Sequence, residues 1–229
     1  MVREVAKSEY NQIASVWNKC FGDSKEDIES FLLMHEENSV FVGKYLLVGG
    51  EEILASFLSL IPAKLKLKDR LQDCYYVYAV CTHPDYRKRG YCEEVLEYIR
   101  NRYFNDMPGF LVPQEKYLID YYNKRGYILL HNGEDEGYSE VYRQDMLILK
   151  RSRNIIEYTA ARNKLLDNVN CIMWGKKELK YIFYSYHIEE NDEENIYLPI
   201  YPGLMVSHEM KQILEDNGVE DIYFTLAME

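Results

Sequence analysis

Residues 79–92 read AVCTHPDYRKRGYC and contain the change of pattern from which the architecture follows. A strand-like run ends here and an amphipathic helix begins, with Arg87, Lys88, Arg89 and Gly90 at the junction. The first turn of a helix exposes unpaired N–H groups, and the helix dipole favours a negative charge beside them. Glycine lets such a group approach the backbone closely. The junction therefore predicts an anion site, and the alternative is a solvated basic helix start in an acidic protein.

The segments around this junction alternate between helical and extended patterns. Apolar spacing predicts helices over residues 8–20, 24–36, 90–104 and 115–124. Runs rich in β-branched and aromatic residues predict strands over 39–48, 53–61, 71–82, 109–112, 127–130 and 138–149. A strand–helix–strand unit thus lies between hairpins. This order predicts an α/β fold, in which a mixed, mostly antiparallel twisted sheet is flanked by helices.

A second pattern follows the basic residues Lys150, Arg151 and Arg153. It predicts a helix over 154–169, strands over 170–174 and 179–187, a helix over 205–217 and a strand over 221–228. About 80 residues is small for an independent fold. We therefore predict one domain over residues 1–149, and a smaller C-terminal α/β subdomain over residues 150–229 that packs on it.

Composition narrows the classes of protein and of partner. The chain has 229 residues, of which 47% are hydrophobic, and its formal net charge is −11. This acidity argues against nucleic-acid binding, which needs basic surfaces. No apolar run reaches the roughly 20 residues that span a bilayer, and the N-terminus lacks a signal-peptide pattern. Five dispersed cysteines indicate reduced thiols rather than disulfides or a metal site. We expect a cytoplasmic monomer or homodimer without a membrane contact.

Two motifs in this chain resemble those of a known family. The stretch V-x-T-H-P-x-Y-R-x-R-G-Y looks like the acetyl-CoA-binding segment of the GNAT N-acetyltransferase superfamily, with its signature [RQ]-x-x-G-x-[GA]. Arg87, Gly90 and Cys92 occupy the signature positions, and Cys92 departs from the usual glycine or alanine. Residues 120–127 (DYYNKRGY) resemble the family's helix-four motif. The stretch THPDYRKRGY is most similar to the corresponding sequence in the subgroup that includes the enhanced-intracellular-survival aminoglycoside acetyltransferases.

The resemblance implies a GNAT acyl-CoA N-acyltransferase fold over residues 1–149 and roles for individual residues. Acetyl-CoA is the implied cosubstrate, and its pantetheine arm would meet the backbone of Val80, Cys81 and Thr82. Its pyrophosphate would lie on the turn that comprises Arg87, Lys88, Arg89, Gly90, Tyr91 and Cys92. Tyr122 matches the tyrosine that protonates the departing thiolate, a task for which a neutral phenol is suited.

The general base and the acceptor site are less well defined. Some family members carry a glutamate on the motif strand where this chain has Tyr78. A water relay, or a group from the C-terminal subdomain, is the alternative base. Tyr75, Tyr76, Tyr78 and Tyr86 are explained equally well by an acceptor pocket and by sheet packing. Cys81 is interpreted as a strand residue, because a nucleophilic cysteine needs a histidine partner or an electropositive setting.

These observations predict an N-acetyltransferase. An acetyl group would pass from acetyl-CoA to a primary amine of a small molecule or peptide by direct attack, without a metal. The acidity of the chain favours a basic acceptor. The first alternative is a non-catalytic acyl-CoA-binding regulatory module with the same fold. Others are an enzyme for a different acyl donor, and an interaction domain without a ligand, which leaves the cations at the glycine turn unexplained.

Overall fold

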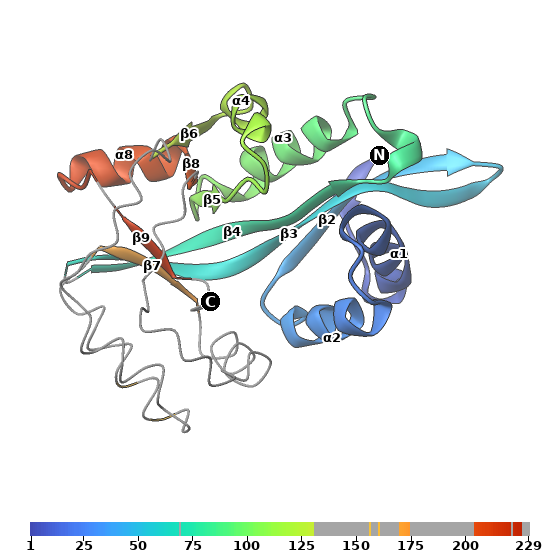
Figure 1. The fold of residues 1–229 in the computed structure, drawn as a ribbon, viewed down its shortest axis with the longest axis horizontal. Helices are drawn as coiled ribbons and strands as arrows, with labels where there is room; N and C mark the ends of the chain where they lie inside the picture. The colour runs from blue at the N-terminus through green and yellow to red at the C-terminus, as the bar shows by residue number, and fades with distance from the viewer. Residues whose placement is uncertain are drawn as a thin grey trace, which may run out of the picture.

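The protein is described here by a computed structural model that covers residues 1–68, 70–130, 156, 160, 170–174, 204–220 and 222–225. Helices and strands alternate around one sheet (Figure 1). In chain order they are β1 (Val2–Glu4), the 3-10 helix η1 (Lys7–Glu9), α1 (Tyr10–Phe21), α2 (Lys25–His35), β2 (Val40–Val48), β3 (Glu51–Leu67), β4 (Arg70–Thr82), the 3-10 helix η2 (Pro84–Tyr86), α3 (Tyr91–Tyr103), β5 (Gly109–Leu111), α4 (Tyr117–Asn123), β6 (Tyr127–Leu129), β7 (Cys171–Trp174), β8 (Met205–Ser207), α8 (His208–Asp216) and β9 (Tyr223–Thr225).

The sheet has the order β1-β2-β3-β4-β5-β8-β6, and β7 pairs with both β3 and β9. Only the β4–β5 and β7–β9 pairs are parallel among the described strands. The predicted fold class, a mixed and mostly antiparallel sheet flanked by helices, is therefore confirmed. The predicted strands 138–149 and 179–187, and nearly all of the predicted helix 154–169, lie outside the described residues.

Alternation along β3 builds the two halves of the core. Phe57 and Ile61 join the cluster that contains Trp17 of α1. Leu58 and Leu60, whose side chains point to the other face, join the cluster that contains Val95 of α3. Figure 1 accordingly shows α1 and α2 on one side of the sheet and α3 and α4 on the other. The long apolar run in β3 follows from this burial on both faces.

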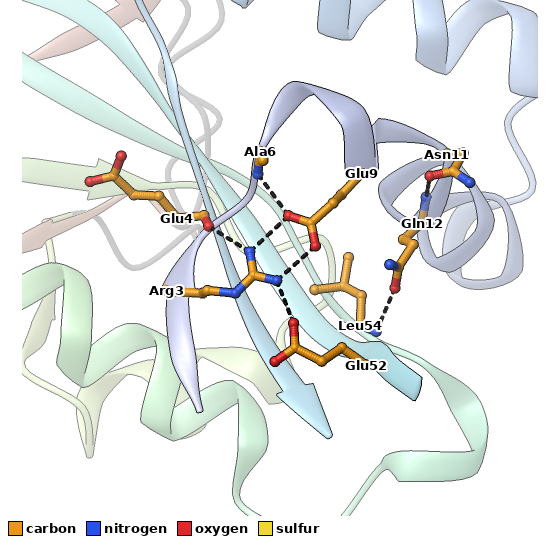
Figure 2. Close-up of polar contacts among 8 residues, drawn as sticks. All are labelled: Arg3, Glu4, Ala6, Glu9, Asn11, Gln12, Glu52 and Leu54. Carbon is orange, nitrogen blue, oxygen red and sulfur yellow. Dashed lines mark hydrogen bonds and ion pairs between the residues drawn. The ribbon is translucent and has the colours of Figure 1, made fainter. Parts of the chain in front are cut away.

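The start of the chain adds a strand that the sequence does not predict. β1 pairs with β2, and a network around Arg3 holds it there (Figure 2). The Arg3 guanidinium donates to both carboxylate oxygens of Glu9 at 2.7 Å and to Glu52 at 2.9 Å. Glu9 also accepts the Ala6 N–H at 2.9 Å. This network depends on side chains from β1, η1 and β3. The three residues of β1 alone therefore show no sequence pattern that predicts a strand.

Two further boundaries differ from the prediction. The strand predicted to stop at residue 61 continues to Leu67. Pro62 lies between the part of β3 that pairs with β2, which ends at Leu60, and the part that pairs with β7, which begins at Ala63. A proline is tolerated better where the neighbour along that edge changes.

The second difference concerns the predicted helix 205–217. Its first three residues form β8, and the helix α8 begins at His208. Met205 and Val206 are completely buried, which favours a strand inside the sheet. The Ser207 hydroxyl then accepts the Met210 N–H and caps the helix. In the described part of the chain, no helix has the length and apolar composition needed to cross a membrane.

Candidate functional site

β4 is distorted immediately before the cationic turn. Tyr78 pairs with Ser59 and Cys81 with Phe57, so β4 has one residue more than β3 between these pairs. Ala79 lies in this bulge and has a left-handed φ of 51°, a conformation that is uncommon outside glycine. Such a bulge bends the strand and breaks its pairing.

On its other side β4 also parts from its neighbour. The described β5 pairs with β4 only at Tyr75 and Tyr76. Val80, Cys81 and Thr82 therefore lie beyond the part of β4 that pairs with β5, although Cys81 and Thr82 still pair with β3. The β4–β5 register thus ends before these residues, and a parting of two parallel strands is the arrangement that an extended ligand arm requires.

The turn after β4 presents its backbone and its cations to solvent. Arg87, Lys88 and Arg89 are all exposed, and Lys88 adopts a left-handed φ of 61°. Gly90 is the N-cap of α3 at φ 80°, and a Cβ there would meet none of the described atoms within 4 Å. Because glycine has no side chain, it cannot itself cap the N–H groups of Tyr91 and Cys92. These groups, the dipole of a 13-residue helix and three cations favour an anion.

Two acidic residues in the first turn of α3 would oppose an anion, and both are neutralised. Glu93 accepts a hydrogen bond from Arg125 at 2.9 Å. Glu94 forms an ion pair with Lys44 of β2. Because Glu93 and Glu94 are paired with Arg125 and Lys44, they do not form ion pairs with the cations of the turn.

Arg87 reaches back to the end of β4. Its Nε donates to the Thr82 carbonyl at 3.2 Å, and one Nη lies 3.9 Å from the Cys20 sulfur. The Cys20 thiol also donates to the Thr82 carbonyl, at 3.3 Å. A carbonyl oxygen has two lone pairs, so these two contacts occupy the Thr82 carbonyl. Two of the three strand positions expected to meet pantetheine thus have their carbonyls engaged, because the Ser56 hydroxyl also donates to the Cys81 carbonyl at 2.9 Å.

Cys20 is a residue of this region that the sequence analysis did not identify. The Cys81 thiol and then Arg87 lower the pKa of the half-buried Cys20 to about 6, against the effect of its burial. Burial raises the pKa of Cys81 well above its ordinary value. A lowered thiol pKa is therefore found at Cys20, beside Cys81 and Arg87, whereas Cys81 is a buried strand residue. Nothing in the sequence signals this contact, because Cys20 and Arg87 are 67 residues apart.

Tyr122 belongs to the second motif segment and lies near the first. Its side chain is 6% exposed and belongs to the core cluster that contains Val77 of β4. Burial holds its pKa well above the usual value, and its position near Cys92 and Cys81 adds to the shift. The phenol is therefore protonated at neutral pH, as an acid must be before it donates a proton.

The opposite face of β4 is aromatic. Tyr78 packs against Trp17 and Phe31, with ring centroids 5.7 and 5.4 Å apart. Tyr76 is buried and stacks on Phe110 at 4.9 Å. Tyr76 and Tyr78 are thus explained by packing beneath α1 and α2, and the position of the family glutamate is occupied by a phenol.

His83 is anchored to the turn that follows β4. Its Nδ1 accepts the Asp85 N–H at 3.2 Å, and its Nε2 lies 2.7 Å from the Lys19 Nζ. Burial and the neighbouring Lys19 lower the pKa of His83. Within the residues that the structure describes, no group of three or more His, Cys, Asp or Glu side chains could hold a metal ion.

Comparison with known proteins gives one family match. Residues 1–130 match a family model described as an acetyltransferase (GNAT) domain, which is more than half of the chain. A search of curated proteins gives no match.

Several solved structures resemble this chain at low sequence identity, and the first of the three below reaches a TM-score of 0.50. A GCN5-related N-acetyltransferase from Anabaena variabilis is 16% identical with a TM-score of 0.50, and the match covers 86% of this chain and 50% of that one. A probable N-acyltransferase from Enterococcus faecalis is 19% identical with a TM-score of 0.43, covering 56% of this chain and 31% of that one. Glucosamine-6-phosphate N-acetyltransferase from Arabidopsis thaliana is 12% identical with a TM-score of 0.46, covering 61% and 96%. This chain thus spans half or less of the length of the first two.

Proposed function

The chain belongs to the GNAT acetyltransferase family, and from this premise we propose that it is an N-acetyltransferase that uses acetyl-CoA. The acceptor is a primary amine of a small molecule or peptide. One observation carries the proposal: the buried phenol of Tyr122 interacts with Cys92, at the cationic turn before α3, and with Cys81, at the bulged end of β4. Each part matches one need of the reaction, namely a held cosubstrate, an accessible thioester and a proton for the leaving thiolate.

In this proposal the residues of the turn bind the cosubstrate. The N–H groups at Gly90, Tyr91 and Cys92 and the cations of Arg87, Lys88 and Arg89 hold the pyrophosphate. The backbone of Val80 orients the pantetheine arm, and Cys81 takes part through its carbonyl only if the Ser56 hydroxyl releases it. Thr82 takes part only if Arg87 or Cys20 releases its carbonyl, and an arriving pyrophosphate is a competing partner for Arg87.

Tyr122 acts in the proposal as the proton donor. The amine attacks the thioester carbonyl directly, and an N–H beside the bulge at Ala79 polarises that carbonyl. A buried, neutral phenol keeps its proton until a thiolate forms beside it, and then donates it. Tyr78 lacks the carboxylate of a general base, so we assign deprotonation of the amine to a water relay or to a group in the C-terminal segment.

A second candidate is favoured by the same Tyr78. A chain without a carboxylate at this position can bind acyl-CoA and serve as a regulatory module without turnover. Turnover with any amine excludes this candidate. The subgroup of enhanced-intracellular-survival aminoglycoside acetyltransferases, the division at residue 149, the cytoplasmic location and the monomeric or homodimeric state remain predictions from the sequence.

Binding of the cosubstrate is tested by thermal unfolding with CoA. A ligand that binds only the folded state raises the melting temperature by mass action. We expect a shift for the wild type and none for Arg87→Glu. Lys25→Glu, an exposed charge reversal in the first turn of α2, is the matched control and keeps the shift. A wild type that shows no shift at millimolar CoA would rule out the proposed cosubstrate.

Catalysis is tested by release of free thiol from acetyl-CoA over a panel of amines. Tyr122→Phe removes only the hydroxyl, so we expect turnover to fall by about 100-fold with the CoA-induced thermal shift kept. Tyr117→Phe, on the same helix but 74% exposed, is the control. Equal turnover of Tyr122→Phe and the wild type would remove Tyr122 from the reaction.

A further inference from the structure

α4 carries Tyr122 but is a weak helix by itself. It has seven residues, and Lys116 at its N-cap makes no side-chain capping bond with the described residues. Isolated helices shorter than about 12–15 residues are marginal in water. The orientation of Tyr122 must therefore come from contacts that α4 makes with its surroundings.

Arg125 provides such contacts at the C-terminus of α4. Its backbone N–H donates to the Tyr122 carbonyl at 2.9 Å, and its Nη1 donates to the Tyr121 carbonyl at 2.8 Å. These two carbonyls are among the last four of the helix, which have no regular i+4 donor within it. A cation at this end also opposes the negative pole of the helix dipole.

The same guanidinium reaches α3. Its Nη2 donates to Glu93 at 2.9 Å, and its plane stacks on the Tyr121 ring at 3.6 Å from the centroid. Glu93 follows Cys92, the last position of the signature at the cationic turn. Arg125 thus joins the two motif segments, and its side chain is only 18% exposed.

Tyr121, on which Arg125 packs, is in direct contact with Tyr122. The two rings meet edge to face with centroids 5.3 Å apart and an angle of 87°. Tyr121 also contacts the Cys92 sulfur on α3. Tyr122 also meets the Tyr127 ring edge to face, with centroids 5.9 Å apart. A shift of Tyr121 would therefore move the Tyr122 phenol against a packed neighbour.

We propose that Arg125 is a positioning residue that ties α4 to the first turn of α3 and so sets where the Tyr122 hydroxyl stands relative to the cosubstrate turn. The inference rests on the proposed function, because Tyr122 is the group that Arg125 positions. Lysine does not replace arginine here, since a single ammonium lacks the planar fork that serves Glu93, the Tyr121 carbonyl and the Tyr121 ring together.

The test is a double-mutant cycle between Arg125 and Tyr122, measured by thiol release in the full chain. Arg125→Ala should lower kcat by about tenfold or more, because a misplaced catalytic group loses rate, and should change KM for acetyl-CoA much less. In the Tyr122→Phe background the same substitution should cost less than about threefold, because its effect passes through Tyr122. Arg102→Ala, at the other end of α3 and exposed, is the matched control and leaves kcat unchanged.

Two milder variants keep the test valid if Arg125→Ala does not fold. Arg125→Lys and Glu93→Gln should give smaller kcat losses in the same direction, and these should also vanish in the Tyr122→Phe background. Equal losses in both backgrounds, or no loss in either, would overturn the role of Arg125 while leaving Tyr122 in place. Full turnover of Tyr122→Phe alone would overturn Tyr122 and Arg125 together, and an inactive wild type would overturn the proposed function itself.

Discussion

Cys20 and Cys81 show how strongly the chemistry of a side chain depends on its neighbours. The two thiols interact, yet their pKa values shift in opposite directions. Cys20 is half-buried, and its hydrogen bond with the Cys81 thiol and then its contact with Arg87 lower its pKa. Cys81 is fully enclosed in the sheet, where burial disfavours the charge. The difference between a reactive and an inert cysteine here arises from position alone.

We expect Cys20 to be alkylated with a rate that rises through a midpoint near pH 6, since its pKa is lowered to about 6. Peptide mapping after timed iodoacetamide treatment from pH 5 to about 9 measures this. Arg87→Ala removes a cation that favours the thiolate, so the midpoint should move to higher pH. Buried Cys74, whose pKa is raised by burial, is the internal control and stays unmodified. A wild-type midpoint near the ordinary value of about 8.5 would contradict the assignment.

At the scale of elements, short segments are positioned by side chains from other elements. β1 has three residues and α4 has seven. Arg3 joins β1 to η1 and to β3 through Glu9 and Glu52, and also stacks on Tyr45 at 3.7 Å. Arg125 joins α4 to α3 in a similar manner. In both cases one guanidinium provides several donors and a flat face at once.

The Arg3 network predicts acid sensitivity. Hydrogen bonding to Arg3 lowers the pKa of Glu9 from 4.5 to about 2. Because the folded-state pKa lies below that of the unfolded chain, the contribution of Glu9 is complete above about pH 4.5 and is lost as the pH falls towards 2. Glu9→Gln should lower the free energy of unfolding by about 1 kcal/mol at pH 7, since part of the network is screened by solvent.

Urea denaturation of both proteins at several pH values between 7 and about 3 measures this difference. The two curves of stability against pH should approach each other below about pH 4.5, where the unfolded chain binds a proton at Glu9 and the folded protein does not yet do so. Glu29→Gln, an exposed position on α2, is the control and should follow the wild type. A constant difference at every pH would show that the carboxylate charge of Glu9 is not involved.

At the scale of the whole molecule, a strand from near the C-terminus completes the sheet. β8 lies between β5 and β6, although about 75 residues separate it from β6 along the chain. Ser207 secures this arrangement, because its hydroxyl accepts the Gly109 N–H of β5 and the Met210 N–H of α8, each at 3.3 Å. Its residue is 1% exposed, so water cannot replace a lost partner.

Ser207→Ala should therefore lower the free energy of unfolding by about 1–2 kcal/mol, through loss of a helix cap and of a buried acceptor. Thermal unfolding should show a fall of about 2–6 °C in the melting temperature. The control is Ser30→Ala, where the exposed hydroxyl donates to Glu26 within one helix. An unchanged melting temperature for Ser207→Ala would mean that β8 is held without this hydroxyl.

The turn of the candidate site could be predicted from the sequence because its signals are local. Gly90 and Gly126 supply left-handed conformations at φ 80° and 85°, as their places after the cations and after a helix suggest. The bulge at Ala79 could not be predicted, since a left-handed alanine has no local signature and is held by the pairing of β3 with β4. Arg125 lies within a motif that the sequence displays, but its link to Glu93 emerges only when α3 and α4 are adjacent.

The sequence by itself determined the alternation of helices and strands, the cationic glycine turn and the family resemblance. These depend on hydrophobic periods, glycine placement and residue types within a few positions of each other. Only the tertiary structure decided that β8 fills the sheet, that Arg87 and Cys20 occupy the Thr82 carbonyl, and that Arg125 bridges the two motifs. Each of these contacts joins residues distant in the chain. Their partners are selected by the combined packing of many weak interactions, which no short stretch of sequence contains.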